Sequence, residues 1–352
     1  MVALPFAVEA RRPNPLHVTL LLTALLAGVS LLSLGTGAAG LPPARLLSAL
    51  TGTDPLTQAE ALILHDIRLP RLTMGLLVGA ALAIAGALMQ GLFRNPLADP
   101  GIVGVGAGAG LGAVLAIVLG GLLPPAIAVL IGGHLVPLAA FLGGWIATLI
   151  LTKAAASGGT TSIATLLLAG IALGALAGAA TGILTFLADD QQLRDLTFWS
   201  MGSLAGASWA KIATALPLIL PVLILSPLLA RALNALALGE AQAAHMGIAV
   251  ERTKRLAILG TAAAAGAATA IAGGIGFIGI VVPHLLRLAT GPDHRALLPN
   301  AALLGGTLLI AADMIARTLT APAELPIGIV TATLGAPVFL WILLRRRGLA
   351  GI

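Results

Sequence analysis

Residues 163–187 read IATLLLAGIALGALAGAATGILTFL, a run without a charged side chain. A helix of this length spans about 37 Å at roughly 1.5 Å per residue, which is enough to cross the hydrocarbon core of a bilayer. A helix on the surface of a water-soluble protein would carry a polar face, and this run lacks one. The stretch therefore predicts a transmembrane helix.

The composition of the whole chain supports the same conclusion. Apolar residues make up 59% of the 352 positions and charged residues 9%, whereas a soluble domain is roughly half apolar and a quarter charged. The 19 Lys and Arg residues lie between apolar segments rather than in one patch, which argues against nucleic acid as a partner. Cysteine is absent, so disulfides and thiolate chemistry are excluded.

Ten stretches reach or approach the roughly 20 apolar residues that a membrane helix needs. They cover residues 16–35, 70–92, 101–120, 126–151, 163–187, 211–231, 256–273, 275–290, 297–318 and 326–344. Arg11 and Arg12 before the first stretch resemble the start of a signal peptide, but no clear cleavage site follows, so we expect a retained helix. The predicted fold class is an all-α polytopic membrane protein in which residues 1–352 form one domain.

The basic residues predict the orientation of these helices. If the N-terminus is cytoplasmic, thirteen Lys and Arg residues fall inside and six outside, which satisfies the positive-inside rule. The inner set is Arg11, Arg12, Arg94, Lys153, Arg231, Arg252, Lys254, Arg255, Arg287, Arg295, Arg345, Arg346 and Arg347, and the outer set is Arg45, Arg68, Arg71, Arg194, Lys211 and Arg317. We therefore expect both termini in the cytoplasm.

A short sequence recurs in the two halves of the chain. Gly79-Ala-Ala-Leu-Ala-Ile-Ala-Gly86 recurs as Gly266-Ala-Ala-Thr-Ala-Ile-Ala-Gly273, and Pro96 recurs as Pro283 at the same offset. The two copies lie on helices that we expect to cross the membrane in opposite directions, as an inverted repeat requires. Helices two to five and seven to ten are thus predicted to be related halves.

Four glycines recur at every fourth position of the stretch quoted above, namely Gly170, Gly174, Gly178 and Gly182. They remove side chains from one face of the helix. Such a face either packs closely against another helix or lines a wide pathway, and the residues alone leave both readings open.

The chain lacks recognisable sites for nucleotides, metals or covalent catalysis. The glycines from Gly104 to Gly112 do not form a G-x-x-x-x-G-K-[ST] phosphate loop. The six histidines are scattered without metal-ligand spacing. We expect neither catalytic residues nor a bound metal, and if ATP drives transport, another polypeptide must hydrolyse it.

Three arginines are expected at the outer ends of the helices, with Arg68 and Arg71 at the second and Arg317 at the ninth. They are either anchors at the membrane surface or a basic patch that captures carboxylates of a partner. Asp313 lies one turn before Arg317, so an ion pair is expected. An intramembrane carboxylate also leaves open an ion-coupled secondary transporter.

A short polar segment, residues 232–255, separates the sixth and seventh stretches. Within it, a helix-like run bounded by Gly239 and Gly247 is followed by Glu251, Arg252, Lys254 and Arg255. A solvated cytoplasmic loop and a lever that docks on a cytoplasmic motor both fit this pattern.

The chain resembles the permease subunits of ATP-driven importers for iron chelates, haem and vitamin B12, known as the FecCD-type family. The resemblance covers nearly all of residues 16–347. It rests on Arg68-Leu-Pro-Arg71, Gly86-Ala-Leu-Met-Gln90, Asn95-Pro-Leu-Ala-Asp-Pro100, Leu166-Leu-Leu-Ala-Gly170, Gly276-Phe-Ile-Gly-Ile-Val-Val-Pro-His284 and Glu324-Leu-Pro-Ile-Gly328.

The resemblance implies a homodimer in the bacterial inner membrane, with two cytoplasmic ATPase subunits that hold ATP and Mg²⁺, and a periplasmic binding protein. It implies a pathway along the dimer axis that is lined partly by the fifth and tenth helices, which favours the pathway interpretation of the face from Gly170 to Gly182. Arg68, Arg71 and Arg317 match arginines that bind two glutamates of the binding protein. The segment from Leu238 to Gly247 matches the family's coupling helices, so the expected ATPase contacts are Leu238, Gly239, Glu240, Ala243 and Gly247.

The resemblance also suggests a substrate. The stretch from Ala188 to Leu204, with its Phe-Trp-Ser-Met-Gly-Ser-Leu run, is most similar to the haem branch of the family. Haem is therefore the expected substrate, and ferric siderophores and vitamin B12 remain the alternatives.

Overall fold

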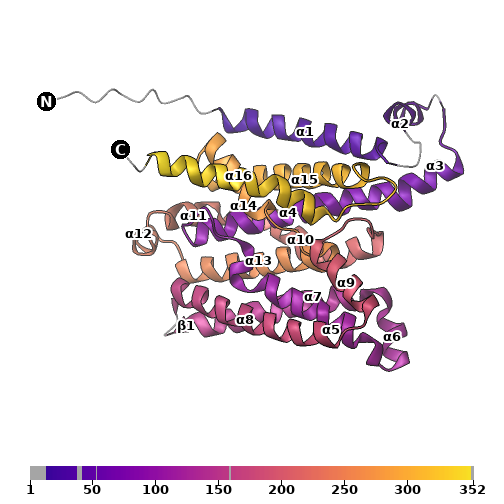
Figure 1. Cartoon of the computed structure of the whole chain (residues 1–352). Helices are drawn as coiled ribbons and strands as arrows, with labels where there is room; N and C mark the ends of the chain where they lie inside the picture. The colour runs from indigo at the N-terminus through magenta and orange to yellow at the C-terminus, as the bar shows by residue number, and fades with distance from the viewer. Residues whose placement is uncertain (1–12, 38–41, 53, 158–159, 350–352) are drawn as a thin grey trace.

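The computed structural model describes residues 13–37, 42–52, 54–157 and 160–349, and Figure 1 shows a bundle of roughly parallel and antiparallel helices. The first half contains α1 (Pro15–Gly35), α2 (Pro43–Leu50), α3 (Gln58–Leu62), η1 (Ile63–Arg68), α4 (Leu69–Leu92), η2 (Pro100–Val103), α5 (Val105–Leu119), η3 (Gly120–Leu122), α6 (Pro125–Ile131), η4 (Gly132–His134), α7 (Leu135–Ala155), strands β1 (Ala156–Ser157) and β2 (Thr160–Thr161), and α8 (Ile163–Leu187). The second half contains α9 (Asp190–Met201), α10 (Trp209–Leu225), η5 (Ser226–Leu229), α11 (Ala230–Leu236), α12 (Glu240–His245), α13 (Val250–Ala272), α14 (Ile278–Thr290), α15 (His294–Thr318) and α16 (Ile327–Leu349).

All ten predicted stretches contain helix. Within the described residues, eight helical segments are long and apolar enough to cross a membrane, and α14 and the apolar part of α16 (Ile327–Trp341) are shorter apolar helices. The prediction of an all-α polytopic membrane fold is therefore confirmed. Arg11 and Arg12, which we used for the orientation, lie outside the described residues.

Several predicted boundaries differ from the structure. The stretch 126–151 is divided into α6 and α7, the stretch 256–273 begins at Val250, and the stretch 275–290 becomes helical only at Ile278. The backbone between α13 and α14 is not helical because it passes against the end of α9. A Cβ at Gly273 would lie 2.3 Å from the carbonyl oxygen of Trp199. Gly273 also has a φ of +75°, a conformation that glycine adopts without strain and that ends α13.

The two halves of the chain pack in corresponding ways. α4 and α13, which carry the two copies of the repeated sequence, contact each other and contain the most continuously buried stretches of the bundle. α15 packs on α4 as α7 packs on α13, and α14 packs on α15 as α5 packs on α7. α4 follows α3 at one end of the bundle, whereas α13 follows α12 at the other (Figure 1), so the two run in opposite directions. This arrangement is that of the predicted inverted repeat.

Small residues allow the central helices to approach one another. A Cβ at Gly79 of α4 would lie 2.3 Å from the carbonyl oxygen of Gly305 in α15. A Cβ at Gly108 of α5 would lie 2.3 Å from that of Gly143 in α7. Dispersion and close backbone contact dominate helix association where lipid replaces water, so these glycines are packing residues.

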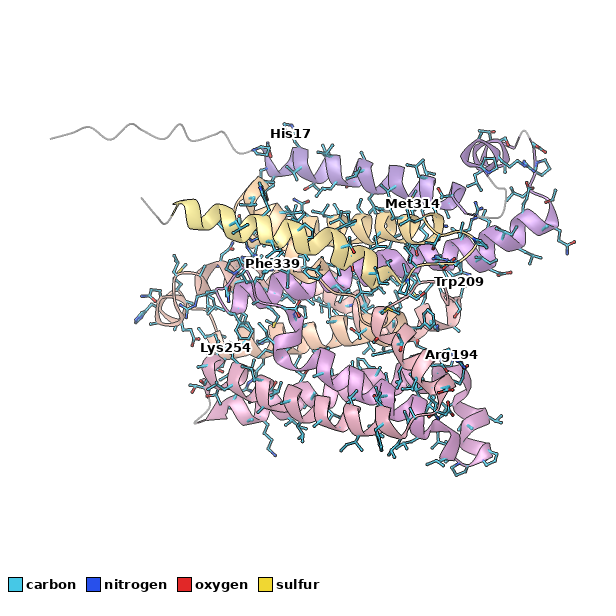
Figure 2. The ribbon with its side chains drawn as sticks, viewed as in Figure 1. His17, Arg194, Trp209, Lys254, Met314 and Phe339 are labelled. Atoms are coloured by element: carbon cyan, nitrogen blue, oxygen red, sulfur yellow. The ribbon has the colours of Figure 1, made fainter. Side chains whose placement is uncertain are left out.

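The two ends of the bundle carry different elements. α12 and the β1–β2 hairpin lie at one end, together with the start of α1 and the end of α16 (Figure 1). The other end carries α2, α3, α6 and α9. Figure 2 places Lys254 and Arg194, which the sequence assigned to opposite sides, at opposite ends of the bundle.

Candidate functional site

Arg71 is the centre of an ion-pair cluster at the end of the bundle that carries α2 and α3. Its Nε and Nη2 atoms donate to the Asp313 carboxylate at 2.9–3.1 Å. Nη1 and Nη2 also donate to Glu324 at 2.8 and 2.9 Å. Bidentate pairs of this kind are the strongest that arginine forms. The Asp313 side chain is 4% exposed and that of Glu324 is 37% exposed, so Glu324 marks where the cluster meets the surface.

The other two arginines are held by the end of α1. Arg317 donates to the carbonyl oxygens of Ser33 at 2.8 Å and Thr36 at 2.9 Å, and Arg68 donates to the carbonyl oxygen of Leu34. The carbonyls of Ser33 and Leu34 belong to the last turn of α1, and that of Thr36 to its C-cap residue. Carbonyl groups at the C-terminal end of a helix have no intrahelical partner. The arginines therefore fix the end of α1 against α4 and α15.

The cluster differs from an exposed basic patch. The side chains of Arg71 and Arg317 are 11% and 7% exposed, and two carboxylates offset part of the positive charge. The expected pair of Asp313 and Arg317 is present at 3.5 Å. Arg71, from a helix distant in the sequence, is the closer partner of Asp313, and spacing along the chain gave no sign of this pair. A carboxylate shared by two arginines is a poor candidate for an ion-coupling site, because it already has fixed counter-ions.

The glycine face of α8 is mostly uncovered. Among the residues that the structure describes, a Cβ at Gly174, Gly178 or Gly182 would meet nothing within 4 Å, whereas one at Gly170 would lie 2.6 Å from the carbonyl oxygen of Ile102. Of these four glycines, Gly170 alone packs against another described part of the chain. Large apolar side chains of the same helix are also exposed, including Leu168, Ile171, Leu176, Ile183 and Phe186. This surface is available for a pathway, a second subunit or lipid.

The predicted coupling segment folds as the short helix α12. Gly239 precedes it with a φ of +121° and Gly247 follows it with a φ of +79°, so each end needs the conformational freedom of glycine. Ala243 is fully buried, whereas Leu238 and Met246 are 66% and 54% exposed. The helix thus rests on the bundle through Ala243, and the apolar side chains that flank its two ends are exposed.

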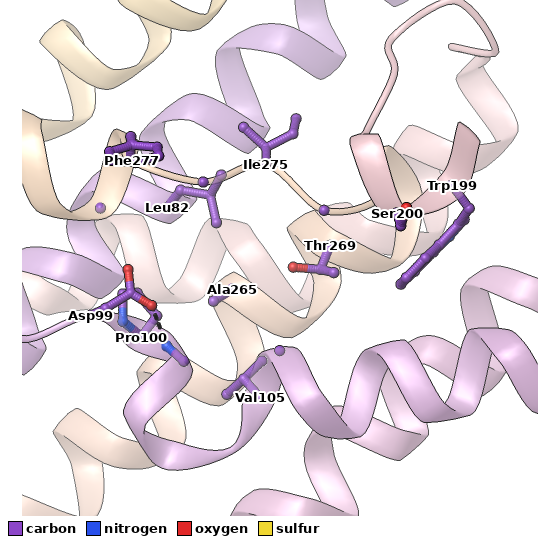
Figure 3. Close-up of a pocket in the computed structure, with 15 residues that line it drawn as sticks. Leu82, Asp99, Pro100, Val105, Trp199, Ser200, Ala265, Thr269, Ile275 and Phe277 are labelled. Atoms are coloured by element: carbon purple, nitrogen blue, oxygen red, sulfur yellow. Dashed lines mark hydrogen bonds between the residues drawn. The ribbon is translucent and has the colours of Figure 1, made fainter. Parts of the chain in front are cut away.

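A cavity of about 360 Å³ lies between α4, η2, α9 and the segment joining α13 to α14 (Figure 3). Asp99, Trp199, Thr269 and Phe277 contribute to its wall. Burial raises the pKa of the Asp99 carboxyl, and its hydrogen bond from the Gly101 N–H, at 2.7 Å, acts in the opposite direction. Parts of the wall lie in the motifs quoted above, but local sequence does not reveal that they meet.

Comparisons with known proteins agree with this architecture. The FecCD transport family matches residues 24–345. The hemin transport system permease protein HmuU of Yersinia pestis is 51% identical over 283 residues, 80% of this chain and 83% of that protein. The vitamin B12 import system permease protein BtuC of Klebsiella pneumoniae is 44% identical over 328 residues, 93% of each chain. A solved inward-facing structure of a metal-chelate type ABC transporter matches with a TM-score of 0.81 and 31% identity, over 94% of this chain and 99% of that one. These matches span nearly all of the described helices, and the chain belongs to the FecCD transport family.

Proposed function

We propose that this chain is the permease subunit of an ATP-driven importer whose substrate is haem. The observation that carries the choice of substrate is the 51% identity to a hemin permease, compared with 44–46% to vitamin B12 permeases. The stretch from Ala188 to Leu204, which forms α9 and the turn after it, favours the same choice. Ferric siderophores and vitamin B12 are the alternative substrates of the same machine.

The pathway in this proposal runs along the uncovered face of α8. Gly174, Gly178 and Gly182 leave room beside the helix, and a second copy of the chain supplies the opposite wall. A surface of Gly and Ala offers a bulky, flat ligand few strong contacts. Weak contacts suit a conduit, because the substrate must leave as readily as it enters.

In this proposal, the ATPase subunits act on the permease through α12. Leu238 and the exposed face of the helix contact an ATPase subunit that holds ATP and Mg²⁺, and both termini of the permease lie on the same, cytoplasmic side. The buried face of α12, with Ala243, transmits movement of the ATPase to the bundle. The permease itself holds no nucleotide.

A periplasmic binding protein docks at the opposite end, near Arg68, Arg71 and Arg317. Because Arg71 is already bound to Glu324, whose side chain is partly exposed, a carboxylate of the binding protein must compete with Glu324 for the guanidinium group. Docking is thus an exchange of ion-pair partners, and its association rate falls with added salt.

The proposal is tested by uptake into proteoliposomes that contain this chain, its ATPase and its binding protein. Hemin, a ferric hydroxamate siderophore and vitamin B12 are compared in parallel, with and without ATP. ATP-dependent uptake of hemin alone supports the proposal. Uptake of a siderophore or of vitamin B12 without hemin overturns the substrate. Uptake driven by a proton or sodium gradient in vesicles without the ATPase would overturn the mechanism.

A further inference from the structure

Lys254, in the first turns of α13, is a buried cation with three separate acceptors. Its residue is 2% exposed. Its Nζ atom donates to Glu240 of α12 at 2.7 Å, to Glu251 of α13 at 3.0 Å and to the carbonyl oxygen of Thr161 in β2 at 3.0 Å. An ammonium group has three N–H donors, so this site uses all of them.

The three acceptors belong to three elements: Glu251 lies on α13 itself, Glu240 on the preceding helix α12, and Thr161 on β2, which is distant in the sequence. Glu240 opens the short helix α12, and Thr161 ends the hairpin that joins α7 to α8. Glu251 completes the arrangement, because its second carboxylate oxygen accepts the Thr161 N–H at 2.9 Å. Both backbone polar groups of Thr161 are thus held by side chains of α13.

The hairpin is directly connected to α8. Ala156 pairs with Thr161 across the two strands. The next residue, Ser162, is the N-cap of α8, and its hydroxyl accepts the Thr165 N–H at 3.2 Å. A displacement of Thr161 therefore moves the first turn of α8, the helix that carries the open glycine face.

We propose that Lys254 is a positioning residue that couples α12 to the start of α8. This inference rests on the proposed function, because it takes α12 as the element that an ATPase moves. The connection from Glu240 through Lys254 to Thr161 is short. It is also stiff, because separating these acceptors would leave the buried ammonium charge without a partner. Movement of Glu240 is carried through the ammonium group to Thr161, rather than through the length of the bundle.

A double-mutant cycle tests the link on the full chain in lipid nanodiscs, without any partner. Glu240→Gln perturbs one end, and hydrogen–deuterium exchange of peptides covering residues 160–166 reports on the other. In the native background we expect exchange there to become about three- to tenfold faster, as for residues that share an interaction network. In the Lys254→Met background, Glu240→Gln should not change the exchange rate of these peptides further. Equal effects of Glu240→Gln in both backgrounds would overturn the link.

Two further variants separate coupling from general destabilisation. Arg255→Met removes the same charge from the neighbouring, exposed position and should leave the effect of Glu240→Gln intact. Lys254→Arg keeps a charged donor and should restore part of the effect of Glu240→Gln on exchange. Loss of the effect in Arg255→Met, or no recovery in Lys254→Arg, would contradict a specific role for Lys254.

A second experiment uses the absence of cysteine from the chain. Ala164→Cys, at an exposed position in the first turn of α8, is labelled with a maleimide in the complex with the ATPase, with and without ATP and vanadate. We expect a nucleotide-dependent labelling rate in the native background and a constant rate with Lys254→Met. A nucleotide-dependent rate in both backgrounds overturns the inference. Failure of the native chain to import substrate, with the exchange cycle intact, would instead overturn the proposed function alone.

Discussion

Replacing Asp313 with asparagine removes a negative charge from a site where two arginine side chains meet. The Asp313 carboxylate is 4% exposed and accepts hydrogen bonds from Arg71, and Arg317 lies 3.5 Å away. An asparagine of the same shape cannot compensate either charge. Removing one partner of a buried ion pair costs about 3–5 kcal/mol. We expect the lower part of this range, because Glu324 and the carbonyl oxygens at the end of α1 remain as acceptors.

The assay is equilibrium unfolding in mixed micelles of dodecyl maltoside and SDS, followed by the fluorescence of the four tryptophans. Asp54→Asn is the matched control. Asp54 also pairs with an arginine, Arg45 at 3.1 Å, but the Asp54 side chain is 65% exposed. Loss of this ion pair should therefore lower the free energy of unfolding by less than about 1 kcal/mol. Equal stabilities of the two variants would refute the structural role of Asp313. Loss of transport with unchanged stability would favour the ion-coupled reading.

Three other perturbations test separate parts of the molecule. Glu324→Gln leaves Arg71 with one carboxylate fewer, so we expect several-fold faster association of the binding protein. The association rate is measured by surface plasmon resonance at two salt concentrations. A slower or unchanged rate would contradict docking by exchange of ion-pair partners. Gly178→Val fills open space and should reduce uptake while the protein folds normally. Gly112→Val would place its Cβ 2.1 Å from a backbone oxygen and should lower the yield of folded protein in size-exclusion chromatography. Identical behaviour of the two variants would refute the distinction between an open and a packed glycine. The pKa of Asp293 is lowered, first by the backbone N–H of Arg295 and also by the Asn234 side chain. The contribution of Asp293 to stability is therefore present above about pH 4 and is lost as the pH falls through the lowered pKa. Asp293→Asn should make the loss of stability with acid less steep, and an unchanged dependence of stability on pH would contradict this contribution.

The sequence predicted the membrane fold well because the relevant signals are local. A span of about 20 apolar residues has few alternatives to a membrane helix, since every backbone polar group in lipid must be satisfied within the segment. Residues 163–187 became α8 with the predicted boundaries. The repeat around Gly79 and Gly266 also correctly indicated two related halves, because the copies are recognisable without knowing how they pack.

The late start of α14 could not be predicted in the same way. Its cause is the close approach of Gly273 to the backbone of α9, and α9 lies about 70 residues earlier in the chain. The cavity beside Asp99 has the same origin, because its wall combines segments that are far apart in the sequence.

The sequence by itself thus determined the membrane location, the helical fold, its ten stretches and the family. Tertiary structure decided which charges meet. Sequence spacing identified the pair of Asp313 and Arg317, one helical turn apart, but could not reveal that Arg71 lies closer to Asp313 or that Lys254 joins Glu240 to Thr161. Periodicity reports neighbours within one helix, whereas contacts between helices depend on crossing angle and rotation, which the packing of small residues sets only when the bundle assembles.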